Sequence, residues 1–274
     1  MKTLIKTPWE KTREFILGNL VSVLFIVVCI VGIPVSGYSA QYLVSEIVTR
    51  ISRNAFLVIS LLIPILAGMG LNFGMTLGAM AGQIGLIIVC DWHIVGIPGL
   101  ILAAIISTPI SILLGLFCGK ILNMARGREM VTSYIMGYFV NGVYQLIVLF
   151  FMGWIIPLAS KNLILPRGYG VRNTVNLITM RKILDNLIPL KIFGIQIPVA
   201  TLLVIAVFCL FFLWFKKTKL GQDMRAVGQD MEVAREAGIR VERTRIIAIT
   251  LSTVFAGYGM ILYLQNIVQQ HQSI

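Results

Sequence analysis

Six long apolar runs dominate the chain, and short polar stretches separate them. The runs cover residues 15–35, 55–90, 99–119, 131–157, 197–215 and 246–264. Because about 20 apolar residues in a helix cross the hydrocarbon core of a bilayer, each run predicts a membrane span. The run at 55–90 is long enough for two crossings, with a tight turn near Asn72. The pattern predicts an all-α fold, namely a polytopic integral membrane bundle of helices.

The composition agrees with a membrane protein rather than a soluble domain. Of the 274 residues, 58% are hydrophobic and only 12% are charged, which is half of the roughly 25% that is usual in soluble domains. The net charge of +12 could suggest a nucleic-acid partner. The basic residues lie beside apolar runs, however, so anionic lipid and membrane topology explain them better, and no nucleic-acid partner is expected.

The distribution of basic residues predicts the orientation of the chain. With the N-terminus in the cytoplasm, the inner segments are 1–14, the turn near Asn72, 120–130 and 216–245. These segments hold 15 of the 23 Lys and Arg residues, as expected for cytoplasmic loops. The remaining bases are Arg50, Arg53 and six in a long external loop at 158–196. Residues 1–274 then form a single transmembrane domain.

The apolar runs contain no Asp, Glu, Lys or Arg at their cores. A carrier driven by protons usually places an ionisable residue at membrane depth, so this absence favours another energy source. The chain also lacks a phosphate-binding loop, an H-E-x-x-H motif, a G-x-S-x-G motif and a paired C-x-x-C. We therefore expect neither an enzyme nor a metal or cofactor site. An ion-coupled secondary transporter stays open as the alternative, and a membrane enzyme is weaker.

Glycines recur every four residues in the second predicted span, at Gly70, Gly74, Gly78 and Gly82. On a helix they form one smooth ridge against which a neighbouring helix can pack closely. At about 100° per residue, three polar residues fall on roughly the opposite face: Asn72, Thr76 and Gln83. These side chains either line a path for solute or form hydrogen bonds between helices.

A second polar stripe follows the predicted span at 131–157. Its members are Tyr134, Tyr138, Asn141 and Gln145, with the spacing i, i+4, i+7, i+11 that places them on one helical face. Aromatic rings beside amides suit a neutral solute that carries hydroxyl groups. The alternative is an interior seam of the bundle, and the solute pathway is slightly favoured.

The segment 216–245 concentrates charge between two apolar runs, with eight basic and five acidic residues. It contains the run Lys219-Leu-Gly-Gln-Asp-Met-Arg225-Ala-Val-Gly228 and continues to Ala234-Arg235-Glu-Ala-Gly238-Ile239. This run resembles the cytoplasmic coupling segment of permeases of ABC importers for simple sugars, nucleosides and branched-chain amino acids. Their segment typically reads T-x-x-G-x-x-x-R-A-V-G-x-x-x-x-A-A-R-x-x-G-I. The glycine-rich stretch from Gly68 to Gly74 also resembles the second, broken span of that family.

The resemblance implies a short coupling helix that docks on a separate ATPase. We expect this helix to begin near Asp230, a suitable N-cap, and to end at Gly238, a common helix stop. The residues assigned to ATPase coupling are Gly221, Arg225, Ala226, Val227, Gly228, Met231, Glu232, Ala234, Arg235, Gly238 and Ile239. Arg225, Glu232 and Arg235 would steer docking. The contact face would consist of Met231, Ala234 and Gly238.

The resemblance further implies a permease subunit of an ATP-driven importer in the cytoplasmic membrane of a bacterial-type cell. The expected partners are a cytoplasmic ATPase that binds ATP and Mg²⁺, a second permease and an external solute-binding protein. The expected cargo is a small neutral polar solute, with simple sugars or nucleosides first and branched-chain amino acids next. Further spans normally follow in that family, so its C-terminal spans are expected to be missing after Ile274.

Overall fold

The computed structural model describes residues 18–152, 155, 170, 183–187, 189–192 and 195–267. The chain divides into two compact units, one of residues 1–48 and 191–196 and one of residues 49–190 and 197–274. The predicted inner segment 1–14 lies outside the described residues, as does most of the predicted external loop 158–196.

The smaller unit contains helix α2 (Leu20–Val35) and the first part of α3 (Ala40–Ser60). Every side chain of α2 is uncharged and nearly all are apolar, as expected of a helix in lipid. At its end the Ser36 amide donates to the Gly32 carbonyl, and the Ser36 hydroxyl donates to the Ile33 carbonyl at 2.8 Å. These bonds satisfy carbonyl groups that the end of a helix leaves without partners.

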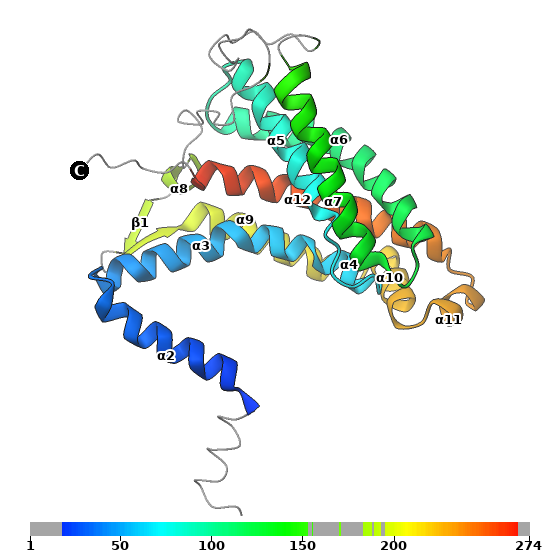
Figure 1. Ribbon diagram of the computed structural model, residues 1–274, viewed down its shortest axis with the longest axis horizontal. Helices are drawn as coiled ribbons and strands as arrows, with labels where there is room; N and C mark the ends of the chain where they lie inside the picture. The colour runs from blue at the N-terminus through cyan, green and yellow to red at the C-terminus, as the bar shows by residue number, and fades with distance from the viewer. Residues whose placement is uncertain are drawn as a thin grey trace, which may run out of the picture. The chain divides into compact units, whose positions relative to one another are not determined.

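The larger unit is built mainly from helices (Figure 1). In chain order these are the rest of α3, then α4 (Leu62–Leu66), α5 (Met75–Asp91), α6 (Ile97–Met124), α7 (Glu129–Leu146), α9 (Val199–Phe215) and α12 (Val241–Ile267). A π-helical turn extends α7 as η1 (Ile147–Phe151). Short helices flank α9: α8 (Ile183–Leu187), α10 (Lys219–Gln229) and α11 (Met231–Glu236). The strands β1 (Pro189–Ile192) and β2 (Ile195–Pro198) also precede α9, and their residues 191, 192, 195 and 196 belong to the smaller unit.

Among the described residues, four helical segments are long and apolar enough to cross a membrane: Ala40–Leu66, Ile97–Met124, Glu129–Phe151 and Val241–Gln265. The pair α9 and α10, bent by 74°, passes the same test together, which gives up to five. The shorter apolar helices are α2 and α5. The prediction of a polytopic helical membrane bundle is confirmed, and the hairpin of β1 and β2 is its only strand pair within the described ranges.

Helices α5, α6 and α12 pack against one another at the centre of the larger unit (Figure 1). Glycines allow the close approach: a Cβ atom added at Gly78 of α5 would lie 2.0 Å from the Thr253 carbonyl oxygen of α12. One added at Gly115 of α6 would lie 2.8 Å from the Cα atom of Thr250. Small residues hold membrane helices together in this way, because dispersion contacts replace the hydrophobic effect inside lipid.

A stack of aromatic rings joins α3, α9 and α12. The ring centroids of Phe56 and Phe208 are 4.3 Å apart, and those of Phe208 and Phe255 are 4.4 Å apart. Near the stack, Gly259 of α12 leaves room for Leu57 of α3, whose side chain would lie within 3.1 Å of an added Cβ atom. The stack therefore connects α9 to α3 and α12.

Helix α3 corrects the expected start of the second span. The apolar run begins at residue 55, but the helix begins at Ala40, so Arg50 and Arg53 lie within a helix and not in an external loop. The Arg53 guanidinium lies 5.1 Å from the centroid of the Tyr263 ring of α12. A helix of this kind can carry an arginine whose guanidinium lies over an aromatic ring. A hydropathy profile does not include this contact, so the predicted span began too late in the chain. The helix therefore starts earlier than the apolar run predicted, and it includes charged residues before position 55.

The second span is broken between α4 and α5, at residues 67–74. Gly68 and Gly70 have φ angles of +72° and +66°, a conformation that favours glycine over other residues. The predicted glycine-rich break is confirmed, but the glycine ridge needs correction. Gly70 lies outside the helix and Gly74 is its N-cap, so a single helical ridge does not run through all four glycines.

Three predicted inner segments meet at one end of the larger unit. The 120–130 segment contacts the start of α12, where the Asn123 amide donates to the Glu242 carbonyl at 2.9 Å. The break contacts α10, because a Cβ atom added at Gly228 would lie 2.3 Å from the Leu66 carbonyl oxygen. Segments that lie on one side of the membrane are expected to meet at one end of the helices, and these three do.

Candidate functional site

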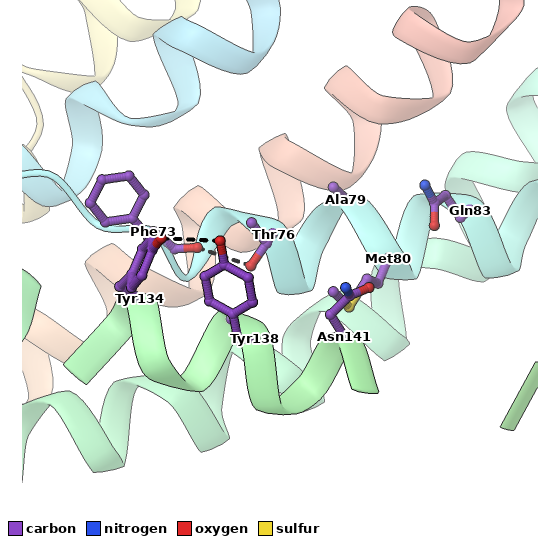
Figure 2. A pocket seen from close by; sticks show the side chains of 9 residues that line it. Phe73, Thr76, Ala79, Met80, Gln83, Tyr134, Tyr138 and Asn141 are labelled. Carbon is purple, nitrogen blue, oxygen red and sulfur yellow. Dashed lines mark hydrogen bonds between the residues drawn. The ribbon is translucent and has the colours of Figure 1, made fainter. Parts of the chain in front are cut away.

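A groove of about 340 Å³ lies between α5 and α7 (Figure 2). Five of the seven residues that the sequence assigned to a solute pathway line it: Thr76, Gln83, Tyr134, Tyr138 and Asn141. Four further residues complete the lining: Phe73, Ala79, Met80 and Gly137. The structure thus brings together the polar residues of two helices that are separated by about 50 positions in the sequence.

Aromatic rings form one end of the groove. Phe73 meets Tyr134 edge-on at 5.5 Å between ring centroids, and Tyr134 meets Tyr138 at 4.8 Å. The two tyrosine hydroxyls share a hydrogen bond of 3.0 Å (Figure 2). Both tyrosines are about half exposed or more, at 49% and 63%. Their ring faces and hydroxyls are therefore available to a solute.

Amides follow the aromatic rings along the groove. In Figure 2, Tyr134, Tyr138 and Asn141 point from successive turns of α7 toward α5. Gln83 and Asn141 supply both donors and acceptors, while Ala79 and Met80 supply apolar surface. None of the nine lining residues is ionised at neutral pH. The groove can therefore bind a neutral polar molecule through hydrogen bonds and ring contacts.

The wall of the groove is fixed by contacts between α7 and the start of α5. A Cβ atom added at Gly137 would lie 2.8 Å from the Thr76 hydroxyl oxygen, so the two helices touch here. The Phe73 amide donates to the Ser133 hydroxyl at 3.2 Å, and Ser133 donates to the Met130 carbonyl at 2.9 Å. The Thr76 hydroxyl donates to the Phe73 carbonyl at 3.0 Å.

Two predicted pathway residues do not line this groove. Asn72 is 2% exposed, and its Oδ1 atom accepts a 2.8 Å bond from the Gly74 amide. This hydrogen bond stabilises the break between α4 and α5. The chain is not helical at Asn72, so the helical face on which the sequence placed this residue does not exist. Gln145 is exposed further along α7 and lies beyond the lining residues. Phe73 lines the groove but was not predicted to do so. It lies in the non-helical break, so no helical periodicity in the sequence indicated its position.

The predicted packing glycines of α5 lie against α12. A Cβ atom added at Gly82 would lie 2.5 Å from the Gly257 carbonyl oxygen, and Gly78 faces Thr253 and Ala256. Gly74 instead faces Cys118 of α6, whose sulfur would lie 2.7 Å from an added Cβ atom. Helix α5 therefore packs against α12 through its glycine face and presents its polar face to the groove.

The second candidate site is the segment of α10 and α11. Thr218 caps α10 by accepting a 3.3 Å bond from the Gly221 amide. Asp230 caps α11 by accepting from the amides of Glu232 and Val233 at 2.8 and 3.1 Å. Gly238 follows the helix with a φ angle of +82°. The predicted short helix between Asp230 and Gly238 is confirmed.

The predicted coupling residues divide into buried and exposed groups. Val227 and Ala234 pack with Val241 in a small apolar cluster, which Ala226, Met231 and Ile239 border. Gly221 and Gly228 are close to backbone, at the end of α9 and at Leu66. The exposed group comprises Arg225, Gly228, Glu232, Arg235 and Gly238, and Gly228 is exposed although it lies close to the Leu66 backbone.

The expected contact face of α11 needs correction. Ala234 is 3% exposed because α11 buries one side against α10 and α12, so Ala234 does not face outward in this structure. Val233, which is 61% exposed, lies on the outer side beside Glu232. A six-residue helix is not stable alone and gains its stability by packing one side against its neighbours, and the sequence did not show which side that would be.

A basic recess of about 730 Å³ lies beside the apolar cluster. Its lining residues are Arg126, Arg235, Ile239, Arg240, Val241, Glu242 and Arg243. Arg126 and Glu242 form an ion pair at 2.6 Å whose side chains are 39% and 67% exposed. Four guanidinium groups around one carboxylate leave the recess with an excess of positive charge.

An ion pair that the sequence analysis did not single out lies beneath the same segment. Arg245 of α12 is fully buried and donates to the carboxylate of Glu129, the first residue of α7. Its other terminal nitrogen lies 3.7 Å from the Met231 sulfur of α11. The sequence placed Arg245 at the edge of a polar loop, where nothing indicated that it would be buried.

Comparison with known proteins identifies the family of the chain. A family model for the branched-chain amino acid transport system / permease component matches residues 15–273. The nucleoside ABC transporter permease protein NupB of Lactococcus lactis is 25% identical to the chain, over 74% of this chain and 55% of its own length. The probable ABC transporter permease protein YphD of Escherichia coli is 39% identical over 24% of this chain and 20% of its own.

The chain spans about half the length of the first of these relatives, and its match to the second covers a fifth of that protein. No solved structure matches it. The family model nevertheless covers nearly the whole sequence, including the broken span, the groove and the segment of α10 and α11. The chain therefore belongs to the family of branched-chain amino acid transport system permease components, a family of ABC transporter permeases, and it is a multi-pass protein of the cell membrane.

Proposed function

We propose that the chain is the transmembrane subunit of an ATP-driven importer for a small neutral polar solute. A nucleoside or a simple sugar is the first candidate, and a branched-chain amino acid is the second. The groove between α5 and α7 supports this proposal most directly, because it combines two tyrosines, two amides and no ionised group.

The chemistry of the groove favours hydroxylated solutes over charged ones. A charged solute would leave its water shell without meeting an opposite charge, which is costly. A sugar ring can place its apolar face on Tyr134 or Tyr138 and bond its hydroxyls to Gln83 and Asn141. The nucleoside permease among the relatives supports the same class of solute.

Three partners complete the proposed transporter. A cytoplasmic ATPase, which binds ATP and Mg²⁺, docks on the segment of α10 and α11. A second permease, identical or different, pairs with this one, and an external binding protein delivers the solute. The exposed charges of Arg225, Glu232 and Arg235 suit a docking surface for a soluble protein.

Uptake measurements test the proposal. Cells that produce the permease with its ATPase and binding protein are given radiolabelled nucleosides, sugars and branched-chain amino acids in turn. We expect uptake of one neutral class that stops when ATP is depleted and persists when an ionophore dissipates ion gradients. Uptake that survives ATP depletion but collapses with the ionophore would indicate an ion-coupled carrier and contradict the proposal.

A further inference from the structure

Arg245 is a fully buried cation near the start of α12. Its exposed fraction is 0%, and that of its partner Glu129 is 13%. Burial removes both groups from water, so each depends on the other for stabilisation of its charge. The exposed pair of Arg126 and Glu242 lies close by but stays solvated. The buried pair therefore connects the start of α7 directly to the start of α12.

The same guanidinium also contacts the predicted coupling helix. Arg245 Nη2 donates to Glu129, whereas Nη1 lies 3.7 Å from the sulfur of Met231, the first residue of α11. Arginine suits this role because its planar fork holds donors in fixed directions. Methionine adapts readily to small displacements of its neighbours. One side chain thus contacts α7, α11 and α12.

Helix α7 leads from this contact to the groove. Ser133 lies one turn after Glu129 and accepts the bond from the Phe73 amide, and Tyr134, Tyr138 and Asn141 follow on the next turns. A helix transmits a displacement at its first turn along its length, because backbone hydrogen bonds connect successive turns. A shift of Glu129 therefore changes the distance between α7 and α5 across the groove.

Arg245 also has an unused donor. Its Nε atom is buried and has no hydrogen-bond partner in the described part of the chain. A buried donor without a partner is unusual in a resting structure. The free Nε–H allows a second arrangement, in which Glu129 accepts from Nε and Nη2 together as a bidentate pair.

We propose that Glu129 and Arg245 are positioning residues that convert movement of α11 into movement of α7, and so couple ATP hydrolysis to opening of the groove. This inference rests on the proposed function. When the ATPase displaces α11, Met231 moves, Arg245 reorients, and Glu129 follows with α7. Neither residue touches the solute, so the pair acts on coupling rather than on solute affinity.

The test measures solute uptake and ATP hydrolysis together, in vesicles that contain the permease, its ATPase and its binding protein. The variants are Glu129→Gln, which removes the carboxylate charge, and Arg245→Lys, which keeps the cation but removes the fork. We expect the number of solutes moved per ATP hydrolysed to fall by about tenfold, the usual scale of coupling between sites. ATPase binding and solute affinity should stay unchanged. The matched control is Glu242→Gln, which breaks the exposed pair and should leave the ratio unchanged.

The outcomes separate the inference from the proposed function. If the unaltered permease takes up no neutral solute with ATP, the proposed function fails. If it transports and both variants keep the normal ratio, the inference is overturned and the function stands. If the variants lose ATPase binding to the same extent as transport, the pair only maintains the structure, and the inference is also overturned. Should Glu129→Gln fail to insert in the membrane, Arg245→Lys decides the question, because it retains a buried charge pair.

Discussion

At the scale of single residues, the groove owes its character to neutral polar side chains. Asn141 and Gln83 can both donate and accept, whereas the tyrosine hydroxyls already share one hydrogen bond of 3.0 Å. The amides therefore have more capacity left for a solute than the phenols do. Asn141 lies on the same helix as the exposed Gln145, which does not line the groove, so the two residues form a natural comparison.

We predict that Asn141→Leu weakens solute affinity by about five- to tenfold, since one hydrogen bond is worth about 1 kcal/mol net. Equilibrium binding of the transported solute to the purified permease measures this. Gln145→Leu, which removes the same kind of amide outside the groove, should bind normally. Equal effects of both substitutions would show that the groove is not the solute site.

At the scale of helices, close packing at glycine decides which faces meet. Gly78 of α5 leaves no room for a Cβ atom, because the Thr253 carbonyl oxygen lies 2.0 Å from that position. Gly142 of α7 is also helical, yet nothing lies within 4 Å of its Cβ position. A substitution of glycine by alanine therefore causes a steric clash at position 78 but not at position 142.

We predict that Gly78→Ala destabilises the protein by about 1–3 kcal/mol through overpacking. Gly142→Ala should instead be neutral or stabilising by about 0.5–1 kcal/mol, because alanine favours the helix. Thermal unfolding of the two variants in the same detergent compares them directly. A Gly78→Ala protein as stable as the unaltered one would contradict the close contact between α5 and α12.

Helix α11 depends on its cap, since six residues are too few to be stable alone. We predict that Asp230→Ala destabilises α11 by about 1 kcal/mol, because the amides of Glu232 and Val233 lose their acceptor. Hydrogen exchange at these amides should become about fivefold faster. Asp230→Asn retains an acceptor and should exchange at nearly the original rate. Equal protection in the alanine variant would exclude a capping role.

At the scale of the whole molecule, charge is concentrated where a soluble partner is expected. The segment 216–245 carries exposed arginines on α10 and α11, and the basic recess lies beside them. We predict that the double reversal Arg225→Glu with Arg235→Glu weakens capture of the ATPase by at least tenfold, because close charge pairs across interfaces contribute about 1.5 kcal/mol or more.

Co-purification of the two chains from membranes measures this effect. The reversal Lys216→Glu with Lys217→Glu is the matched control, since it changes the net charge equally and lies before α10. Loss of binding in the control alone, or in both variants alike, would attribute the effect to general charge rather than to the surface of α10 and α11.

The sequence by itself determined the class of fold, the broken span and the short helix after Asp230. Long apolar runs, glycines at a break and an N-cap residue are local signals, so they need no knowledge of the neighbouring helices. The polar stripe of α7 was visible for the same reason, because a helix repeats every 3.6 residues.

Only the tertiary structure decided which faces meet. The sequence could not show that Thr76 and Asn141 line one groove while Asn72 holds the break, or that α11 buries Ala234. Charged residues misled it most: Arg53 looked like part of a loop but lies on a helix over Tyr263, and Arg245 is buried with Glu129. Whether a charge is solvated or paired depends on groups far away in the chain, and only the folded arrangement brings those groups together.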